Sequence, residues 1–94
     1  METVPVRVQL FGALRKYSNG SDVAFDVPRG TTVSSLRRHL IEALRRGSAS
    51  FAGHDLVNAS VLADESRILE EEHRVGGHGV DEVLVAVLPP VCGG

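Results

Sequence analysis

The sequence predicts an α+β fold in which one main helix packs on a mixed sheet of four to five strands. Two segments near the N-terminus alternate apolar and polar residues, a central segment has apolar residues at helical spacing, and a continuous apolar segment lies near the end. With 94 residues, 43% of them hydrophobic, the chain fits one compact domain. We place this domain at residues 1–90 and a flexible, protruding tail at residues 91–94.

The first two elements are expected to be strands with one buried face each. Both segments show the period of two that is typical of such strands. The apolar positions are Val4, Val6, Val8 and Leu10 in the first segment, and Val23, Phe25 and Val27 in the second. Gly12 to Tyr17 is predicted to wind into a short helical turn, and the turn-forming residues 18–21 follow it.

The third element is expected to be a helix that begins after Pro28-Arg29-Gly30, with Thr31 or Thr32 as its cap. Its apolar stripe consists of Val33, Leu36, Leu40, Ile41 and Leu44. We expect the charged residues of the segment to point away from this stripe: Arg37, Arg38, Glu42, Arg45 and Arg46. Gly47 is the expected end of the helix.

The second half of the chain has a weaker pattern. We expect a loop from Ser48 to His54 anchored by Phe51, a strand from Val57 to Ala63, and a turn at residues 64–66. A short returning strand at residues 67–69 and a surface loop from Glu70 to Val80 follow. Val83 to Leu88 is apolar on both faces, as in a central strand that is covered on each side or exposes one face to a partner.

This order of elements brings the last strand beside the first and parallel to it, after a crossover through the helix. The sequence therefore predicts the β-grasp arrangement.

Composition and charge argue against several function classes. Ten Lys and Arg residues are spread among twelve Asp and Glu, with a net charge of −2, so nucleic acid is not an expected partner. The apolar run at 83–88 is far shorter than the roughly 20 residues that span a bilayer. The N-terminal residues lack a secretion-signal pattern, and we expect a cytoplasmic protein without a membrane segment.

Residues with catalytic or metal-binding potential form no recognisable motif. The four histidines, His39, His54, His73 and His78, are scattered, and no metal site is predicted. The run Glu70-Glu71-Glu72 is interpreted as a solvated face. The single cysteine, Cys92, has no histidine beside it, so chance or a minor role is expected, with a disulfide to a partner's cysteine as an alternative.

The C-terminal tail carries the chemistry. In Leu88-Pro89-Pro90-Val91-Cys92-Gly93-Gly94 the two prolines end strand pairing and extend the chain, and the glycines make its tip thin enough for a narrow channel. A carboxylate becomes a good electrophile once an acyl-adenylate supplies a leaving group, and sulfur can then displace it. The alternative is an idle end, because termini are commonly glycine-rich and frayed.

These residues resemble the sulfur-carrier branch of the ubiquitin-like proteins, especially the small subunit of molybdopterin synthase. The most specific part is Asp81-Glu82-Val83 through the apolar strand to Pro89-Pro90-Val91-Cys92-Gly93-Gly94. Weaker matches are Leu10 to Arg15 and Thr32 to Leu36. The resemblance implies that Gly94 carries the adenylate and then the thiocarboxylate, while Gly93 allows passage into partner active sites.

The resemblance also implies partners and a division of labour. A ubiquitin-activating-like adenylyltransferase would use Mg-ATP, a sulfurtransferase or other sulfur donor would supply sulfur, and the large subunit of molybdopterin synthase or another acceptor enzyme would receive it. The carrier would bind no cofactor and would be a sulfur-donating subunit or co-substrate. Two further partner contacts are expected next to the tail, at Leu88 by resemblance and at Phe11, which falls on the exposed strand face; Arg15 is a possible flanking contact.

Departures from the family pattern keep other functions open. Cys92 replaces the small Ser, Thr or Ala before the two glycines, and the stretch from Ser48 to Val80 follows the molybdopterin pattern poorly. Sulfur carriers for thiamine, cysteine or natural-product biosynthesis share the tail. A ubiquitin-like modifier, whose activated glycine forms an isopeptide bond with a lysine, is an alternative from another class.

Overall fold

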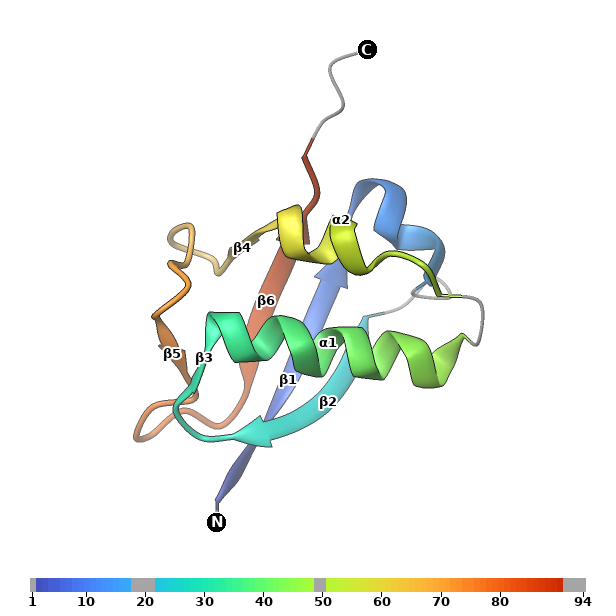
Figure 1. Cartoon of the computed structure of the whole chain (residues 1–94). Helices are drawn as coiled ribbons and strands as arrows, with labels where there is room; N and C mark the ends of the chain where they lie inside the picture. Colours follow the sequence, from blue (N-terminus) through green and yellow to red (C-terminus); the bar gives the residue numbers. More distant parts are fainter. Residues whose placement is uncertain (1, 18–21, 49–50, 91–94) are drawn as a thin grey trace.

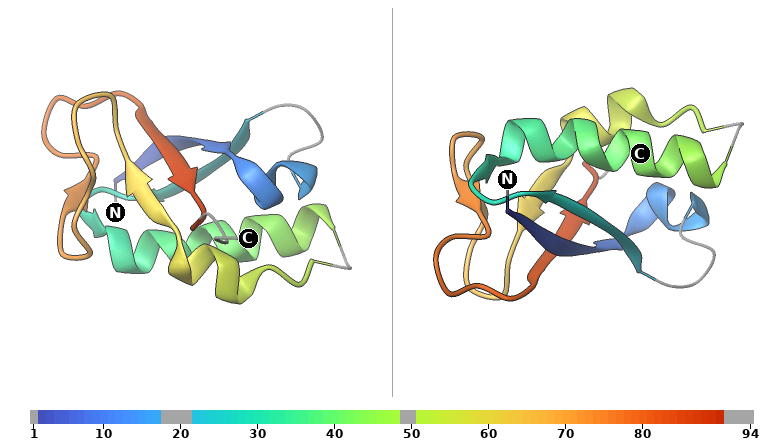
Figure 2. Two further views of the ribbon diagram at one scale, coloured as in Figure 1. Left: turned by 90° about the horizontal axis from the view of Figure 1, so that it is seen from above. Right: turned by 90° about the horizontal axis from the view of Figure 1, so that it is seen from below.

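The protein is built on a four-stranded sheet that carries its helices on one face (Figures 1 and 2). The computed structural model describes residues 2–17, 22–48 and 51–90. The strand order is β2-β1-β6-β4, with β1 at Thr3–Leu10, β2 at Val23–Pro28, β4 at Val61–Ala63 and β6 at Val83–Leu88. Helices α1 (Val33–Gly47) and α2 (His54–Ala59) cover one side, and no helix in the described ranges has the length and apolar character needed to cross a membrane.

The register of the sheet is that of a β-grasp. Strand β6 runs parallel to β1, from the pair Val6 and Val83 to the pair Leu10 and Val87. Strands β2 and β4 run antiparallel to their neighbours, so the sheet is mixed. Parallel neighbours need a crossover, and the chain supplies it by passing over the sheet through α1. The predicted fold class, including the placement of the last strand beside the first, is confirmed.

The core lies between the sheet and α1, where the predicted apolar stripes meet. The inward residues of β1 are buried at every second position, as are Val85 and Val87 of β6. From the helix, Leu36, Leu40 and Leu44 pack against them. Each such aliphatic side chain stabilises the fold by roughly 1.5–3 kcal/mol relative to an exposed one, so the two periodicities fix how α1 lies on the sheet.

The start of α1 is joined to a second, smaller sheet. Thr32 caps the helix, because its hydroxyl oxygen accepts a hydrogen bond of 3.2 Å from the Ser35 amide. Strand β3, Thr31–Thr32, pairs antiparallel with β5, Arg74–Val75. Val75 is buried, so the stretch from Glu70 to Val80 is not only the surface loop that the sequence predicts.

The predicted strand from Val57 to Ala63 is wrong in its first half. Residues His54–Ala59 form α2, and only Val61–Ala63 form a strand. Val57 is buried as the inward residue of this short helix. The expected loop therefore ends before His54, although Phe51 is buried in it as predicted. Short apolar segments fit a strand and a buried helical turn equally well. Here the segment packs against α1 as a helix.

The segment after β4 turns as predicted but does not form a second strand. Asp64 holds the turn, because its Oδ1 accepts hydrogen bonds from the amides of Ser66 at 2.7 Å and Arg67 at 2.9 Å. Beyond it only one bridge forms, between Ala63 and Ile68. The helical turn predicted at Gly12–Tyr17 is present as the 3₁₀ helix η1, whereas the predicted turn at 18–21 lies outside the described residues.

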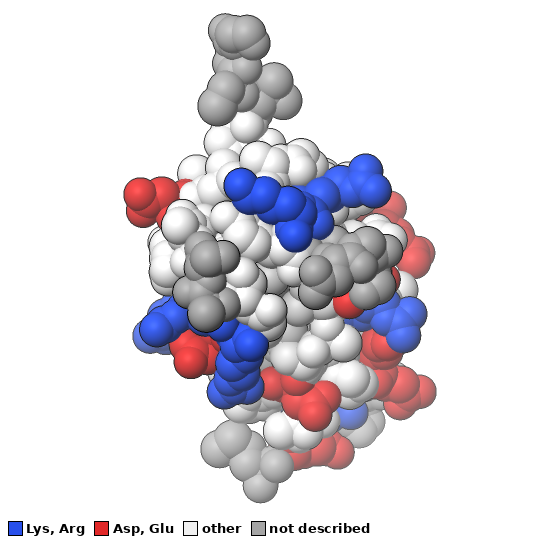
Figure 3. All heavy atoms as spheres, turned by 90° about the vertical axis from the view of Figure 1, so that its right-hand side faces the viewer, with Lys and Arg blue, Asp and Glu red and all other residues white. Residues whose placement is uncertain are grey.

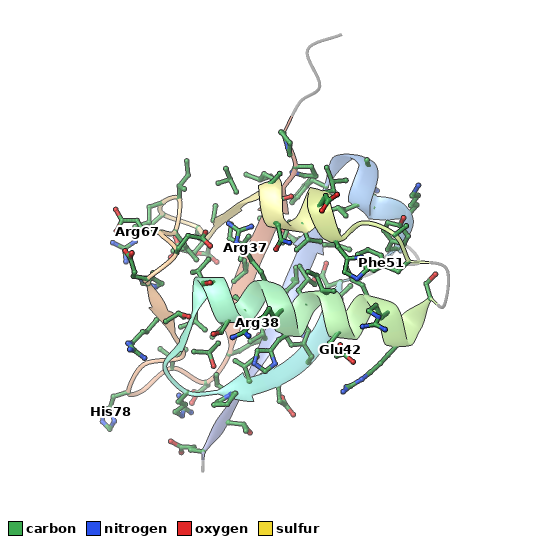
Figure 4. The ribbon with its side chains drawn as sticks, in the orientation of Figure 1. Arg37, Arg38, Glu42, Phe51, Arg67 and His78 are labelled. Carbon is green, nitrogen blue, oxygen red and sulfur yellow. The ribbon has the colours of Figure 1, made fainter. Side chains whose placement is uncertain are left out.

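Arg37 corrects the expectation that all charged residues of α1 point away from the core. The residue is only 8% exposed, and its guanidinium reaches Glu71 and the backbone at the end of α2. Figure 4 shows Arg37 extending from α1 toward α2, while Arg38 and Glu42 lie on the exposed side of the helix. The segment 70–72 is thus tied to the helix rather than fully solvated.

Candidate functional site

The end of β6 is where the chain leaves the sheet. Pairing stops at Leu88, and Pro89 and Pro90, which lack a backbone N–H, follow directly. Gly12 sits against this exit: a Cβ atom at Gly12 would lie 3.5 Å from Cγ of Pro89, and its φ is +59°. The predicted tail residues Val91, Cys92, Gly93 and Gly94 lie outside the described residues, so their roles stay predictions.

An apolar row crosses the sheet at this exit. Val61 on β4 and Leu88 on β6 are directly paired, and both are 39% exposed. Phe11, 41% exposed, follows Leu10, whose partner is Val87, so it continues the row on the other side of Leu88. The helices cover the opposite face, and no described element covers this one. These three side chains therefore lie on the open face of the sheet.

The open face carries further large apolar side chains below this row. Leu84 is 44% exposed, and Ile68 is 68% exposed. Ile68 pairs with Ala63, which itself pairs with Ala86, and residues paired in this way share a face. In the described residues, all five large hydrophobic side chains with high exposure therefore lie on this face or continue it. Such a concentration is typical of surfaces that bind another protein.

Helix η1 borders the exit and holds the remaining predicted contact, Arg15. Leu14 is fully buried and fixes the helix to the core, while Arg15 and Lys16 occupy its exposed last turn. Tyr17 packs edge-on against Phe51 with ring centroids 4.7 Å apart, and the ammonium of Lys16 lies 5.2 Å from the Tyr17 ring centroid. Arg15 thus lies on a well-anchored helix whose first residue, Gly12, borders the tail exit.

The structure gathers no metal-binding cluster from the described residues. Within those ranges no group of three or more His, Cys, Asp or Glu could hold a metal ion. Glu71 is engaged by Arg37, and these hydrogen bonds lower the pKa of its carboxyl below the usual value. Nη2 of Arg67 donates to Nδ1 of His73 at 3.4 Å. Glu71 and His73 therefore both have partners within the fold.

Solved structures share this architecture. The small archaeal modifier protein 1 of Haloferax volcanii superposes with a TM-score of 0.65 and 19% identity, over 94% of this chain and 99% of that one. A Pyrococcus furiosus protein assigned as molybdopterin converting factor subunit 1 gives 0.61 and 19%, over 94% and 99%. The Caldiarchaeum subterraneum ubiquitin gives 0.62 and 16%, over 99% and 100%.

The chain has a ubiquitin-like β-grasp fold. At these identities the likeness is one of fold. No family model matches the sequence, and a search of curated protein sequences finds no match. Function therefore has to be argued from the site that this ubiquitin-like fold presents.

Sequence reasoning found part of the apolar face of the ubiquitin-like fold and missed the rest. Phe11 and Leu88 are exposed beside the tail, where they are predicted. Val61 and Ile68 were not foreseen, because their exposure depends on how the short strand β4 and the turn after it sit at the sheet edge. Leu84 could have been found: it lies in the strand that is apolar on both faces.

Proposed function

We propose that this protein is a ubiquitin-like sulfur carrier whose C-terminal glycine, Gly94, is adenylated and then converted to a thiocarboxylate. The observation that carries the proposal is the exposed apolar row of Phe11, Leu88 and Val61 at the base of the segment that leads to Gly93-Gly94. A partner that takes the tail into its active site must lie against this end of the sheet. Apolar side chains there give it a surface to bury.

The chemistry assigns the reaction to the partners. An adenylyltransferase of the ubiquitin-activating type would use Mg-ATP, with the Gly94 carboxylate attacking the α-phosphorus and pyrophosphate leaving. A sulfide nucleophile from a sulfurtransferase or other donor would then displace AMP, leaving the thiocarboxylate. The carrier would contribute the carboxylate, the thin glycine tip and the docking face, and would hold no cofactor of its own.

The proposed acceptor is the large subunit of molybdopterin synthase. The likeness to the molybdopterin converting factor subunit supports this choice at the level of the fold. Acceptors in thiamine, cysteine or natural-product biosynthesis remain the alternative, because they would use the same tail chemistry.

The test is the intact mass of the protein after incubation with Mg-ATP, its adenylyltransferase and a sulfur source. Exchange of one oxygen for sulfur adds about 16 Da, nearly the mass of one oxidation at Cys92 or Met1, so fragmentation must locate the change. Sulfur on Gly94 supports the proposal. Deleting Gly94, or extending the chain beyond it, should abolish adenylation while the thermal unfolding curve stays unchanged, and adenylation of either variant would contradict it.

A second candidate is a protein modifier, and the likeness to the small archaeal modifier protein favours it. In that case the activated glycine would form an isopeptide bond with a lysine of a target. Lys16 is the only lysine of this chain, so self-conjugation could use only Lys16 or the N-terminal amine. Arg74 is the last basic residue, so trypsin would leave residues 75–94 on a target lysine, and conjugates should be sought by that mass.

A further inference from the structure

Below the apolar row, the open face of the sheet is hollowed and acidic. A hollow of about 300 Å³ lies between β1, β6 and the turn after β4, with Leu84 and Ala86 among its lining residues. Three carboxylates line it, those of Asp22, Asp64 and Glu65. A neighbouring hollow shares Asp64, Glu65 and Leu84 and adds Glu82. An apolar surface is thus bordered by acidic side chains from two edges of the sheet.

The charge of this area is unbalanced. Its one cationic lining group, Arg7, forms an ion pair of 3.3 Å with Glu82. Asp22, Asp64 and Glu65 therefore leave the two hollows with a net charge of −3, whereas the whole chain carries only −2. Figure 3 shows acidic side chains along the right-hand edge and the lower end of the molecule, and basic side chains at the upper end and on both sides.

The spacing of these carboxylates does not suit a metal ion. Among residues that the structure describes, no three acidic, histidine or cysteine side chains converge closely enough to bind one. Oδ1 of Asp64 already accepts hydrogen bonds from the amides of Ser66 and Arg67. These bonds lower the pKa of its carboxyl, which keeps it ionised. Separated carboxylates on two sides of an apolar surface fit a larger organic cation with an aliphatic stem.

We infer that this hollow receives an arginine or lysine side chain of the activating partner, whose apolar residues cover the adjoining row of Phe11, Leu88 and Val61. The aliphatic stem would lie on Leu84 while the charged head reaches the carboxylates, as long basic side chains do at interfaces. The inference rests on the proposed function, because continuity with the tail exit makes the activating enzyme the partner that must contact this face.

A basic partner surface has a measurable consequence, since complementary charge accelerates association and makes it sensitive to salt. The test compares the wild-type chain with the double variant Asp22→Asn, Glu65→Gln. These two residues are chosen because Asp64 holds a turn and Glu82 pairs with Arg7. The matched control, Glu72→Gln with Asp55→Asn, removes the same charge from exposed positions before β5 and on α2, outside the two hollows.

The association rate with the purified adenylyltransferase is measured by stopped flow, without ATP, from low to high salt. We expect the hollow variant to associate about 5-fold more slowly at low salt, with a flatter salt dependence, and the control to match the wild type. In ¹H–¹⁵N spectra of the wild type, the enzyme should broaden signals from residues 22, 63–65 and 84–86. Thermal unfolding curves of all variants establish that they are folded.

The possible outcomes separate the inference from the proposed function. Equal rates for the hollow variant, the control and the wild type, or absence of binding, would overturn the inference. An unchanged kcat/KM for adenylation of Gly94 in the hollow variant at low salt would overturn the inference alone, whereas binding at this face without adenylation would overturn the proposed function alone. Concentration-dependent self-association that the hollow variant loses would assign the hollow to a second copy of this chain and overturn the inference.

Discussion

Arg37 on α1 and Glu71, which precedes β5, form a bidentate ion pair although they are 34 residues apart in the sequence. Nε of Arg37 donates to Oε1 of Glu71 at 2.9 Å, and Nη2 donates to Oε2 at 2.6 Å. Nη1 donates at 2.7 Å to each of the carbonyl oxygens of Val57 and Ser60 at the end of α2. One side chain therefore positions both α2 and the segment that leads to β5.

Replacing Arg37 by alanine should destabilise the fold strongly. The change removes the ion pair and the hydrogen bonds to two carbonyl oxygens at the end of α2, of which that of Val57 keeps only its bond from the Ser60 amide. Breaking a buried pair typically costs 3–5 kcal/mol, and because the Glu71 side chain is 52% exposed we expect about 3 kcal/mol. Urea unfolding measures it. Arg38→Ala, at an exposed position of the same helix, should cost less than about 0.5 kcal/mol. Equal losses for the two variants would contradict this account.

The same pair predicts a loss of stability in acid. Hydrogen bonds from Arg37 lower the pKa of Glu71 below its usual 4.5 in the folded state. The unfolded chain therefore binds this proton more readily, so the contribution is present above the unfolded pKa and is lost as the pH falls through the folded one. The stability difference between the wild type and Glu71→Gln should shrink from about pH 5 downward. Urea midpoints at several pH values test this, with Glu72→Gln as the control; a constant difference would refute it.

The elements whose apolar residues repeat at a regular short spacing can be predicted from the sequence. The alternation of β1 and β2 and the stripe of α1 each depend on near neighbours along the chain, so the residues themselves show which side is buried. The burial of Arg37 could not be predicted, because it depends on Glu71 and on the end of α2, both distant in sequence. A charged residue beside Leu36 is ordinarily an exposed one.

The candidate site divides in the same way. Phe11 and Leu88 could be identified because they adjoin the tail or continue a strand pattern. Val61 and Ile68 share a face with them only through pairing across the edge strand, and the hollow needs side chains from three separate elements. No local sequence pattern predicts that these side chains come together. The proposed tail chemistry, in contrast, depends only on consecutive residues at the end of the sequence.

Gly76 should be the glycine least tolerant of substitution among those described. Its φ is +70°, and a Cβ atom there would lie 2.5 Å from Cγ1 of the buried Val4. Gly76→Ala combines backbone strain with a clash and should cost about 3 kcal/mol or more. Gly79 has a φ of +84° but open space around it, so Gly79→Ala should show the backbone strain alone, a loss of about 1 kcal/mol of stability. Gly77 has neither feature and should be neutral. Thermal unfolding ranks the three variants, and any other order would show that the backbone there relaxes.

Replacing Leu88 or Phe11 by serine should weaken docking while leaving the fold intact. Both side chains are about two-fifths exposed, so their loss should cost under about 1 kcal/mol of stability. In a docked complex they would be fully buried next to the tail, where truncating an anchor costs about 1–2 kcal/mol, or roughly 10-fold in affinity. Pyrophosphate release by the activating enzyme should then show a KM raised about 10-fold and a nearly unchanged kcat, because the tail that reacts is intact. His39→Ser, at an exposed position of α1 on the other side of the sheet, is the control. A kcat that falls while KM stays constant would mean that the apolar row positions the tail for reaction instead of supplying binding energy.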